Sequence, residues 1–129
     1  MPKYAPPSAS VAPRFTGIRT FMRLPNVQDM TDVDFAIVGI PFDTGASYKT
    51  GARFGPSQIR ETSTLQRNYS MNLDVNIFDH LSGVDYGDLP ITPGYIHETY
   101  KQIEEWLKPI LDAGVIPLSM GGDHSITLA

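Results

Sequence analysis

The sequence predicts an α/β fold with a parallel sheet. Strand-like runs at residues 35–40, 83–88 and 115–120 alternate with two helical segments in the order β-α-β-α-β, and the first turn of a further helix follows. Parallel strands that are joined through helices need crossover connections, and these connections are almost always right-handed. The order of elements therefore favours one parallel sheet with helices packed against it.

The first and last runs carry the clearest strand signal. FAIVGI at 35–40 is continuously apolar, and Val115, Ile116, Leu118 and Met120 make the later run largely apolar. Both resemble parallel strands that are buried on both faces. The middle run is short and ends in acids, and residues 72–82 before it are expected to form a connection or a short edge strand.

Two helices are expected between these strands. Gly55-Pro56-Ser57 opens the first, because a proline in the first helical turn loses no hydrogen bond. Thr92 and Pro93 open the second as N-cap and first helical residue. The second helix has an apolar stripe at intervals of three and four residues, formed by Ile96, Tyr100, Ile103, Leu107 and Ile110 or Leu111. In the first helix Arg60 is placed on the wetter face, and Arg53 and Arg60 are expected to form structural ion pairs.

Composition limits the class of protein. The chain has 129 residues, of which 41% are hydrophobic and 19% charged, so it is expected to be globular. Its net charge is −4 and it has no run of Lys or Arg, so we expect no nucleic-acid partner. It contains no cysteine, which excludes disulfides and fits a cytoplasmic protein. No apolar run approaches the roughly 18 residues of a membrane span, so no membrane partner is expected.

The chain is predicted to divide at residue 30. Residues 1–30 are expected to form an extended N-terminal arm, and residues 31–129 to belong to the α/β domain. Within the arm, residues 1–13 are rich in proline, whereas 14–30 are apolar without a clear period. The second stretch is predicted either to pack over the domain or a neighbouring subunit, or to be a surface loop. Because the chain stops a few residues into a predicted helix, we expect it to be the N-terminal part of a chain at least about twice as long.

The most informative stretch for function is VIPLSMGGDHSITLA at 115–129. Gly121 and Gly122 end the last strand, and a helical turn is expected to start at Ile126 with Asp123 or Ser125 as N-cap. Ligands of open α/β sheets bind outside the carboxyl ends of the strands. His124 stands at such an end and is a candidate metal-ligating or catalytic imidazole. The alternative is an ordinary strand-to-helix turn with a surface histidine.

Two other groups of residues are candidates for a binding or catalytic role. His80, Asp85 and Asp88 are near one another in the sequence and have the residue types of a metal cluster, but strand-end acids that cap turns and stay solvated are the favoured interpretation. The glycine-rich loop at 45–55 matches no nucleotide-binding spacing. His97 is predicted to be an exposed surface histidine.

Five segments of the chain are distinctive, namely GIRTFMRLP at 17–25, VGIPFD at 38–43, GARFGPSQIR at 51–60, VDYGD at 84–88 and GGDHS at 121–125. Together they resemble the ureohydrolases, the arginase/agmatinase family, and GGDHS is similar to the first metal-binding signature of that family. The resemblance covers residues 14–129. The segment at 17–25 points to the agmatinase and guanidinobutyrase branch.

The resemblance implies a three-layer α/β/α fold of arginase type, of which this chain holds the N-terminal β-α-β-α-β portion. It also implies a dinuclear Mn²⁺ centre, a small guanidino substrate and a homo-oligomer, trimeric or hexameric. The expected reaction is hydrolysis of agmatine to putrescine and urea. The alternatives are a guanidinobutyrase or related guanidino-acid ureohydrolase, a non-catalytic binding or regulatory relative, and an unrelated nucleotide-binding α/β module.

Residue by residue, the resemblance makes His124 the first metal ligand and Asp123 a neighbouring group that orients it. The remaining ligands and all catalytic residues are expected beyond Ala129. One imidazole cannot hold two metal ions. We therefore expect the 129-residue chain alone to be inactive and to bind manganese weakly or not at all.

Overall fold

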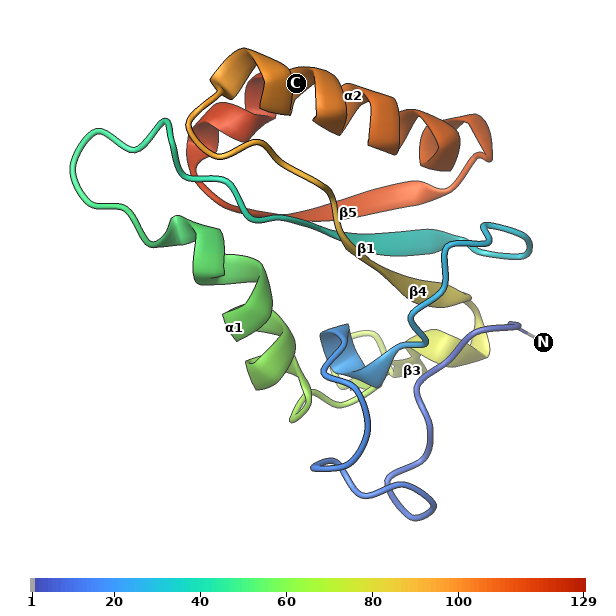
Figure 1. Cartoon of the computed structure of the whole chain (residues 1–129). Coiled ribbons are helices and arrows are strands. Elements are labelled where there is room, and N and C mark those ends of the chain that lie inside the picture. The colour runs from blue at the N-terminus through green and yellow to red at the C-terminus, as the bar shows by residue number, and fades with distance from the viewer. Residues whose placement is uncertain (1) are drawn as a thin grey trace.

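The computed structural model describes residues 2–129, and its centre is a parallel sheet (Figure 1). Strand β1 (Phe35–Ile40) lies between β4 (Gly83–Asp88) and β5 (Ile116–Gly121). Helix α1 (Gly55–Ser63) follows β1, and α2 (Ile96–Asp112) joins β4 to β5. The predicted β-α-β-α-β order and the parallel sheet are confirmed.

Helices cover the sheet on opposite faces. Val38 and Ile40 of β1 pack in a core with Ile103 and Ile110 of α2. On the other face, Gly39 approaches α1 so closely that a Cβ there would lie 3.1 Å from the Pro56 side chain. Figure 1 shows α2 above the strands and α1 below them. The chain therefore forms three layers, helix, sheet and helix, as expected.

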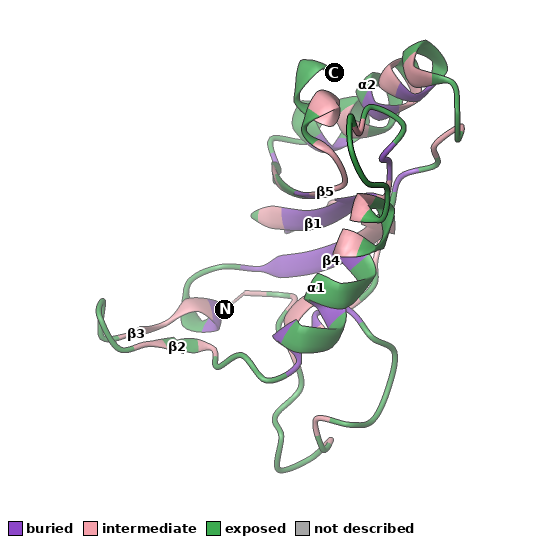
Figure 2. Cartoon of the chain, turned by 90° about the vertical axis from the view of Figure 1, so that its left-hand side faces the viewer, coloured by how far each residue is buried: buried purple, intermediate pink, exposed green. Residues whose placement is uncertain are grey.

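The two strands predicted to be fully buried differ in their exposure. Within β1, residues 36–40 are all buried, as Figure 2 shows. In β5, however, Ile116 is 63% exposed and Leu118 48% exposed. The prediction of burial on both faces is therefore wrong for β5. The physical reason is its place at the sheet edge, where the residues that bury Ile37 and Met120 on the same face do not extend over Ile116 and Leu118.

The N-terminal arm is tied to the domain at several points. Leu24 is 2% exposed and packs against Ile37 and Phe78. A 3₁₀ turn at Phe21–Arg23 precedes it, and the Phe21 N–H donates to Asp85 Oδ2 over 2.7 Å. Of the two alternatives for residues 14–30, packing over the domain is therefore confirmed around Leu24. The division at residue 30 stays a prediction.

Arg60 and Asp85 are both buried, so the predictions that Arg60 lies on a wet helix face and that Asp85 stays solvated are wrong. The Arg60 side chain is 9% exposed, not on a wet face, and its Nε and Nη2 donate to the two Asp85 oxygens over 2.8 and 2.9 Å. Nη1 donates to Asp88 Oδ1 over 2.5 Å. Asp85 is fully buried and so is not a solvated turn acid. The predicted structural ion pair of Arg60 is confirmed.

Helix α2 begins later than the sequence indicates. Its N-cap is Tyr95, not Thr92, because Gly94 at φ +85° interrupts the helical backbone. The Thr92 N–H donates to Thr99 Oγ1, and the same hydroxyl donates back to the Thr92 carbonyl, both over 3.1 Å. These two hydrogen bonds hold the turn at residues 92–95 against the first turn of α2.

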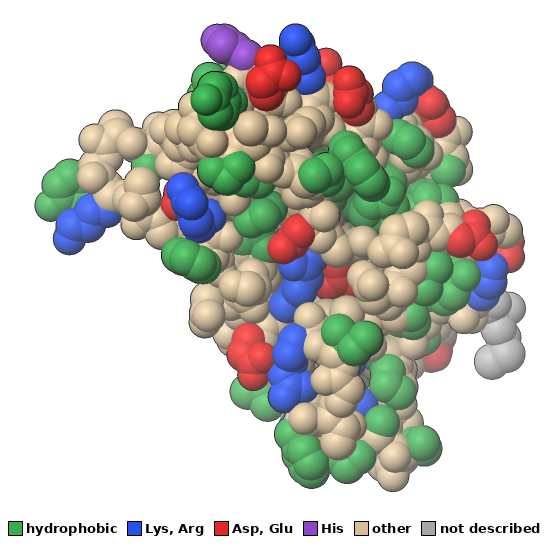
Figure 3. Space-filling model, viewed as in Figure 1, with side chains coloured by type: hydrophobic (Ala, Val, Ile, Leu, Met, Phe, Trp, Pro, Cys, Tyr) green, Lys and Arg blue, Asp and Glu red, His purple; other side chains and the backbone are tan. Residues whose placement is uncertain are grey.

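The remaining elements are short. Strands β2 (Tyr69–Ser70) and β3 (Val75–Asn76) pair antiparallel and form a ribbon that projects from the main sheet (Figure 2). Further 3₁₀ turns span Ala52–Phe54, Ile77–Asp79 and His124–Leu128. Acidic and basic side chains are interspersed on the face drawn in Figure 3. Among residues 2–129, no helix combines the length and apolarity needed to cross a membrane.

Arg60→Ala is expected to lower the free energy of unfolding by about 3–5 kcal/mol, because it leaves the buried Asp85 carboxylate without its counter-charge. The matched control is Arg19→Ala, which removes an exposed ion pair with Glu61. That control should cost at most about 1 kcal/mol. Urea denaturation of both variants measures the difference. Equal effects would show that the buried pair does not stabilise the fold.

Candidate functional site

The carboxyl ends of β1 and β5 meet, and the residues that follow them form the candidate site. The Asp123 N–H donates to the Phe42 carbonyl over 2.8 Å, which fixes the chain after β5 against the chain after β1. Gly122, the residue before Asp123, has φ +83°, and a Cβ there would collide with the carbonyl oxygens of Ile40 and Phe42. Only glycine meets both demands at this position.

Asp123 organises the turn. One carboxylate oxygen accepts from the Gly45 N–H over 2.7 Å and the other from the Ser125 N–H over 2.9 Å. Asp123 is thus the N-cap of the 3₁₀ turn His124–Leu128, one of the two caps that the sequence allowed. The turn starts at His124 rather than at Ile126, since the cap lies two residues earlier than a start at Ile126 requires.

His124 is exposed beside a cavity of about 470 Å³. Its Nδ1 lies 3.4 Å from Thr127 Oγ1, and apolar side chains of α2 form part of the cavity wall. No group of three His, Asp or Glu side chains that could hold a metal ion occurs within residues 2–129. Within the described part of the chain, His124 therefore belongs to no preformed cluster of three metal-ligating side chains.

Asp123 and His124 are adjacent, but the hydrogen bonds of the Asp123 carboxylate run to Gly45 and Ser125. The ligand role of His124 and the orienting role of Asp123 stay predictions. The structure adds that Asp123, the residue before His124, is hydrogen-bonded to Phe42 and Gly45 in the segment that follows β1.

The second candidate cluster does not form. Asp85 and Asp88 are held by Arg60, while His80 is exposed at the end of the 3₁₀ turn Ile77–Asp79. His97 is exposed in the first turns of α2, as predicted.

Asp43 is a site residue that sequence reasoning missed. Its side chain is buried at the end of β1, where Oδ1 accepts from Arg53 Nε and Oδ2 from the Gly51 N–H, each over 2.7 Å. The Arg53 hydrogen bond, followed by that from Gly51, lowers the pKa of Asp43 from 3.8 to about 2. The predicted ion pair of Arg53 is confirmed. The available signal in the sequence was an acid two residues before Gly45, where the glycine-rich loop that contains Arg53 begins.

Comparison with known proteins places the chain in a family. A model of the arginase family matches residues 33–129, so the chain belongs to the arginase family. The chain is 42% identical to guanidinobutyrase of Pseudomonas aeruginosa over 97% of its own length. It is 40% identical to the mitochondrial agmatinase of Gallus gallus over 95% of its length. It spans 40% and 36% of the lengths of these two relatives.

Solved structures agree. Proclavaminate amidinohydrolase from Streptomyces clavuligerus superposes with a TM-score of 0.80 at 35% identity, over 91% of this chain and 39% of that one. A hypothetical agmatinase from Burkholderia thailandensis gives 0.81 at 32% identity, over 88% and 37%. These matches confirm the resemblance and the arginase-type fold. They also overturn the alternative of an unrelated nucleotide-binding module.

Gly122→Ala is expected to destabilise the chain more than Gly114→Ala. Both glycines have left-handed backbones, at φ +83° and +74°, but a Cβ at Gly114 meets no atom within 4 Å. Gly114→Ala should therefore cost only the conformational term of about 1–2 kcal/mol. Gly122→Ala adds a collision with two carbonyls, and thermal unfolding of the two variants compares them. Equal losses would mean that the close approach at Gly122 is unimportant.

Asp43 is expected to make stability depend on acidic pH. Because its pKa is lower in the folded than in the unfolded chain, its contribution is complete above pH 3.8 and is lost as pH falls toward about 2. The difference in unfolding free energy between the wild type and Asp43→Asn should therefore shrink over this interval. Urea titrations at pH 5, 3 and about 2 measure it. A difference that is constant with pH would contradict the assignment.

Proposed function

We propose that this chain is part of a manganese-dependent amidinohydrolase that releases urea from a linear guanidino compound. The observation that carries the proposal is His124, presented at the carboxyl end of β5 by a turn that Asp123, Gly45 and Gly122 fix. Ligands in sheets of this type bind at that edge. The names of the relatives, guanidinobutyrase and agmatinase, support the reaction class.

The donor set at this edge decides what the chain contributes to a metal centre. His124 offers an exposed imidazole, a ligand that suits Mn²⁺ in company with carboxylates. The described residues include no group of three or more ligand side chains, so they do not by themselves fit a dinuclear centre. Manganese, when bound, supplies Lewis-acid activation of water. The chain's own residues supply one ligand and, through Asp123, the backbone that positions it.

The favoured substrate is agmatine, with putrescine and urea as products. Guanidinobutyrate is the alternative, and the relatives include enzymes named for both classes of substrate. A non-catalytic relative that acts as a binding or regulatory subunit is the other alternative. The same proposal includes a trimer or hexamer and a cytoplasmic location, with which the absence of cysteine is compatible.

Urea release is the direct test. The natural polypeptide that carries this sequence, loaded with Mn²⁺, is expected to release urea from agmatine or 4-guanidinobutyrate, whereas the 129-residue chain alone releases none. His124→Ala should lower activity and the affinity for manganese by at least about 100-fold, because removing even an outer partner of a ligand costs up to that much. His97→Ala is the matched control, since His97 is an exposed histidine on α2.

Each outcome separates the alternatives. Manganese-dependent urea release supports the hydrolase, and the preferred substrate identifies the branch. A folded polypeptide that binds no manganese and releases no urea supports the non-catalytic relative. If His124→Ala retains both bound metal and activity, the ligand assignment is wrong.

A further inference from the structure

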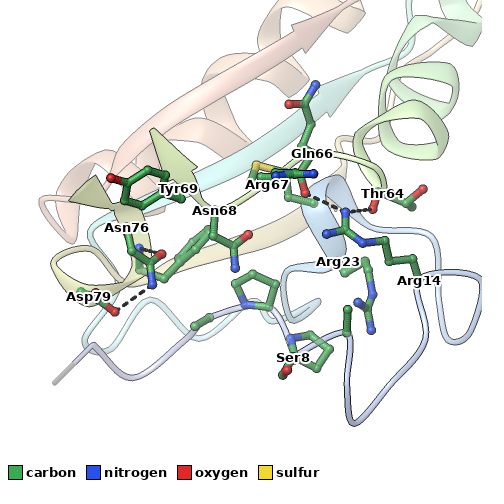
Figure 4. Close-up of a pocket in the computed structure, with 16 residues that line it drawn as sticks. Ser8, Arg14, Arg23, Thr64, Gln66, Arg67, Asn68, Tyr69, Asn76 and Asp79 are labelled. Carbon is green, nitrogen blue, oxygen red and sulfur yellow. Dashed lines mark hydrogen bonds between the residues drawn. The ribbon is translucent and has the colours of Figure 1, made fainter. Parts of the chain in front are cut away.

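A second cavity, of about 510 Å³, lies between the N-terminal arm and the segment that follows α1. Residues 5–9 of the arm form one wall, and residues around Asn68, Asn76 and Asp79 form another (Figure 4). It shares no lining residue with the cavity beside His124. The cavity is therefore separate from the proposed hydrolytic site.

The cavity is basic, although the chain as a whole is acidic. Arg14, Arg23 and Arg67 line it, and Figure 4 shows their side chains on the same side of the cavity. The one acid in its lining is Asp79, whose Oδ1 accepts from Asn76 Nδ2 over 2.9 Å. Asp79 makes no ion pair with any of the three arginines. Positive charge is thus left uncompensated in a chain whose net charge is −4.

Two of the arginines are positioned by the backbone. Arg14 Nη1 donates to the carbonyls of Thr64 and Gln66, over 3.1 and 3.0 Å, at the end of α1. Arg23 Nη2 donates to the Ala12 carbonyl over 2.5 Å. These bonds use neutral acceptors and leave each guanidinium with further N–H donors, since arginine carries five.

Arg67 is the third member and makes no hydrogen bond or ion pair with residues 2–129. Its side chain is exposed in the lining of the cavity, next to Asn68. Planar guanidinium groups recognise carboxylate and phosphate oxygens through paired hydrogen bonds. An oxyanion is the ligand chemistry that three such groups around a polar cavity fit.

The backbone at one wall supports a binding role. Met22 and Arg23 both have left-handed φ angles, +50° and +63°, without being glycine. Consecutive non-glycine residues of this kind cost free energy and concentrate at functional sites. Here the unusual turn places Arg23 in the cavity lining while the Met22 N–H donates to Ser63 Oγ over 2.7 Å.

We propose that this basic cavity binds a small oxyanion ligand, through Arg67 and the free donors of Arg14 and Arg23. The ligand carries either a phosphate or several carboxylates. The site is independent of the hydrolytic reaction, so it can be tested whether or not the proposed function holds.

Isothermal titration calorimetry on the natural polypeptide tests the proposal, with inorganic phosphate and citrate as probes and sodium chloride keeping the ionic strength constant. Arg67→Gln is expected to weaken binding by about tenfold, the loss of one charge-assisted hydrogen bond. Arg67 is exposed and makes no bond within residues 2–129, so this variant should fold normally. The control is Arg19→Gln, an exposed arginine outside the cavity that pairs with Glu61.

The outcomes are distinct. Tighter binding of phosphate indicates a phosphorylated ligand, and tighter binding of citrate indicates a polycarboxylate. The affinities for phosphate and for citrate should be unaffected by Arg19→Gln and by His124→Ala. The proposal is overturned if neither anion binds more strongly than chloride, or if Arg19→Gln weakens binding as much as Arg67→Gln does.

Discussion

The Asp85 carboxylate lies in the interior of the domain, and the fold depends on its being neutralised there. Arg60 from α1 meets both of its oxygens, and the Phe21 N–H from the N-terminal arm meets one of them. Because a buried charge without partners is strongly unfavourable, α1, β4 and the arm must assemble together around this group. Asp88, which shares Arg60, extends the same constraint to the end of β4.

Carboxylates also organise the candidate site at the carboxyl ends of β1 and β5. Asp43 holds the glycine-rich loop through Gly51 and Arg53, and Asp123 holds the turn after β5 through Gly45. Asp43 and Asp123 follow the carboxyl ends of β1 and β5, which are neighbouring strands. Their hydrogen bonds satisfy backbone N–H groups in loops that have no regular structure to satisfy them. The result is that hydrogen bonds hold the backbone after β1 and the backbone after β5, which carries His124.

Much of the fold could be predicted from the sequence because its signals are local. The apolar run of β1, the spacing of Ile103 and Ile110 in α2 and the Asp123 cap each depend on residues within a few positions of one another. The same holds for the family resemblance, since its segments are contiguous in sequence. His124 was identified in this way, although its metal-binding role rests on that resemblance and not on contacts within the chain.

The sequence by itself determined the order of elements, the parallel sheet, the family and the position of His124. The tertiary structure decided which charged groups are buried and which strand faces are covered. Arg60 and Asp85 are 25 residues apart, and nothing in their local patterns shows that they meet. The exposure of Ile116 and Leu118 likewise depends on the place of β5 at the sheet edge. Contacts between distant segments fix both features, and such contacts leave no periodic trace in a single sequence.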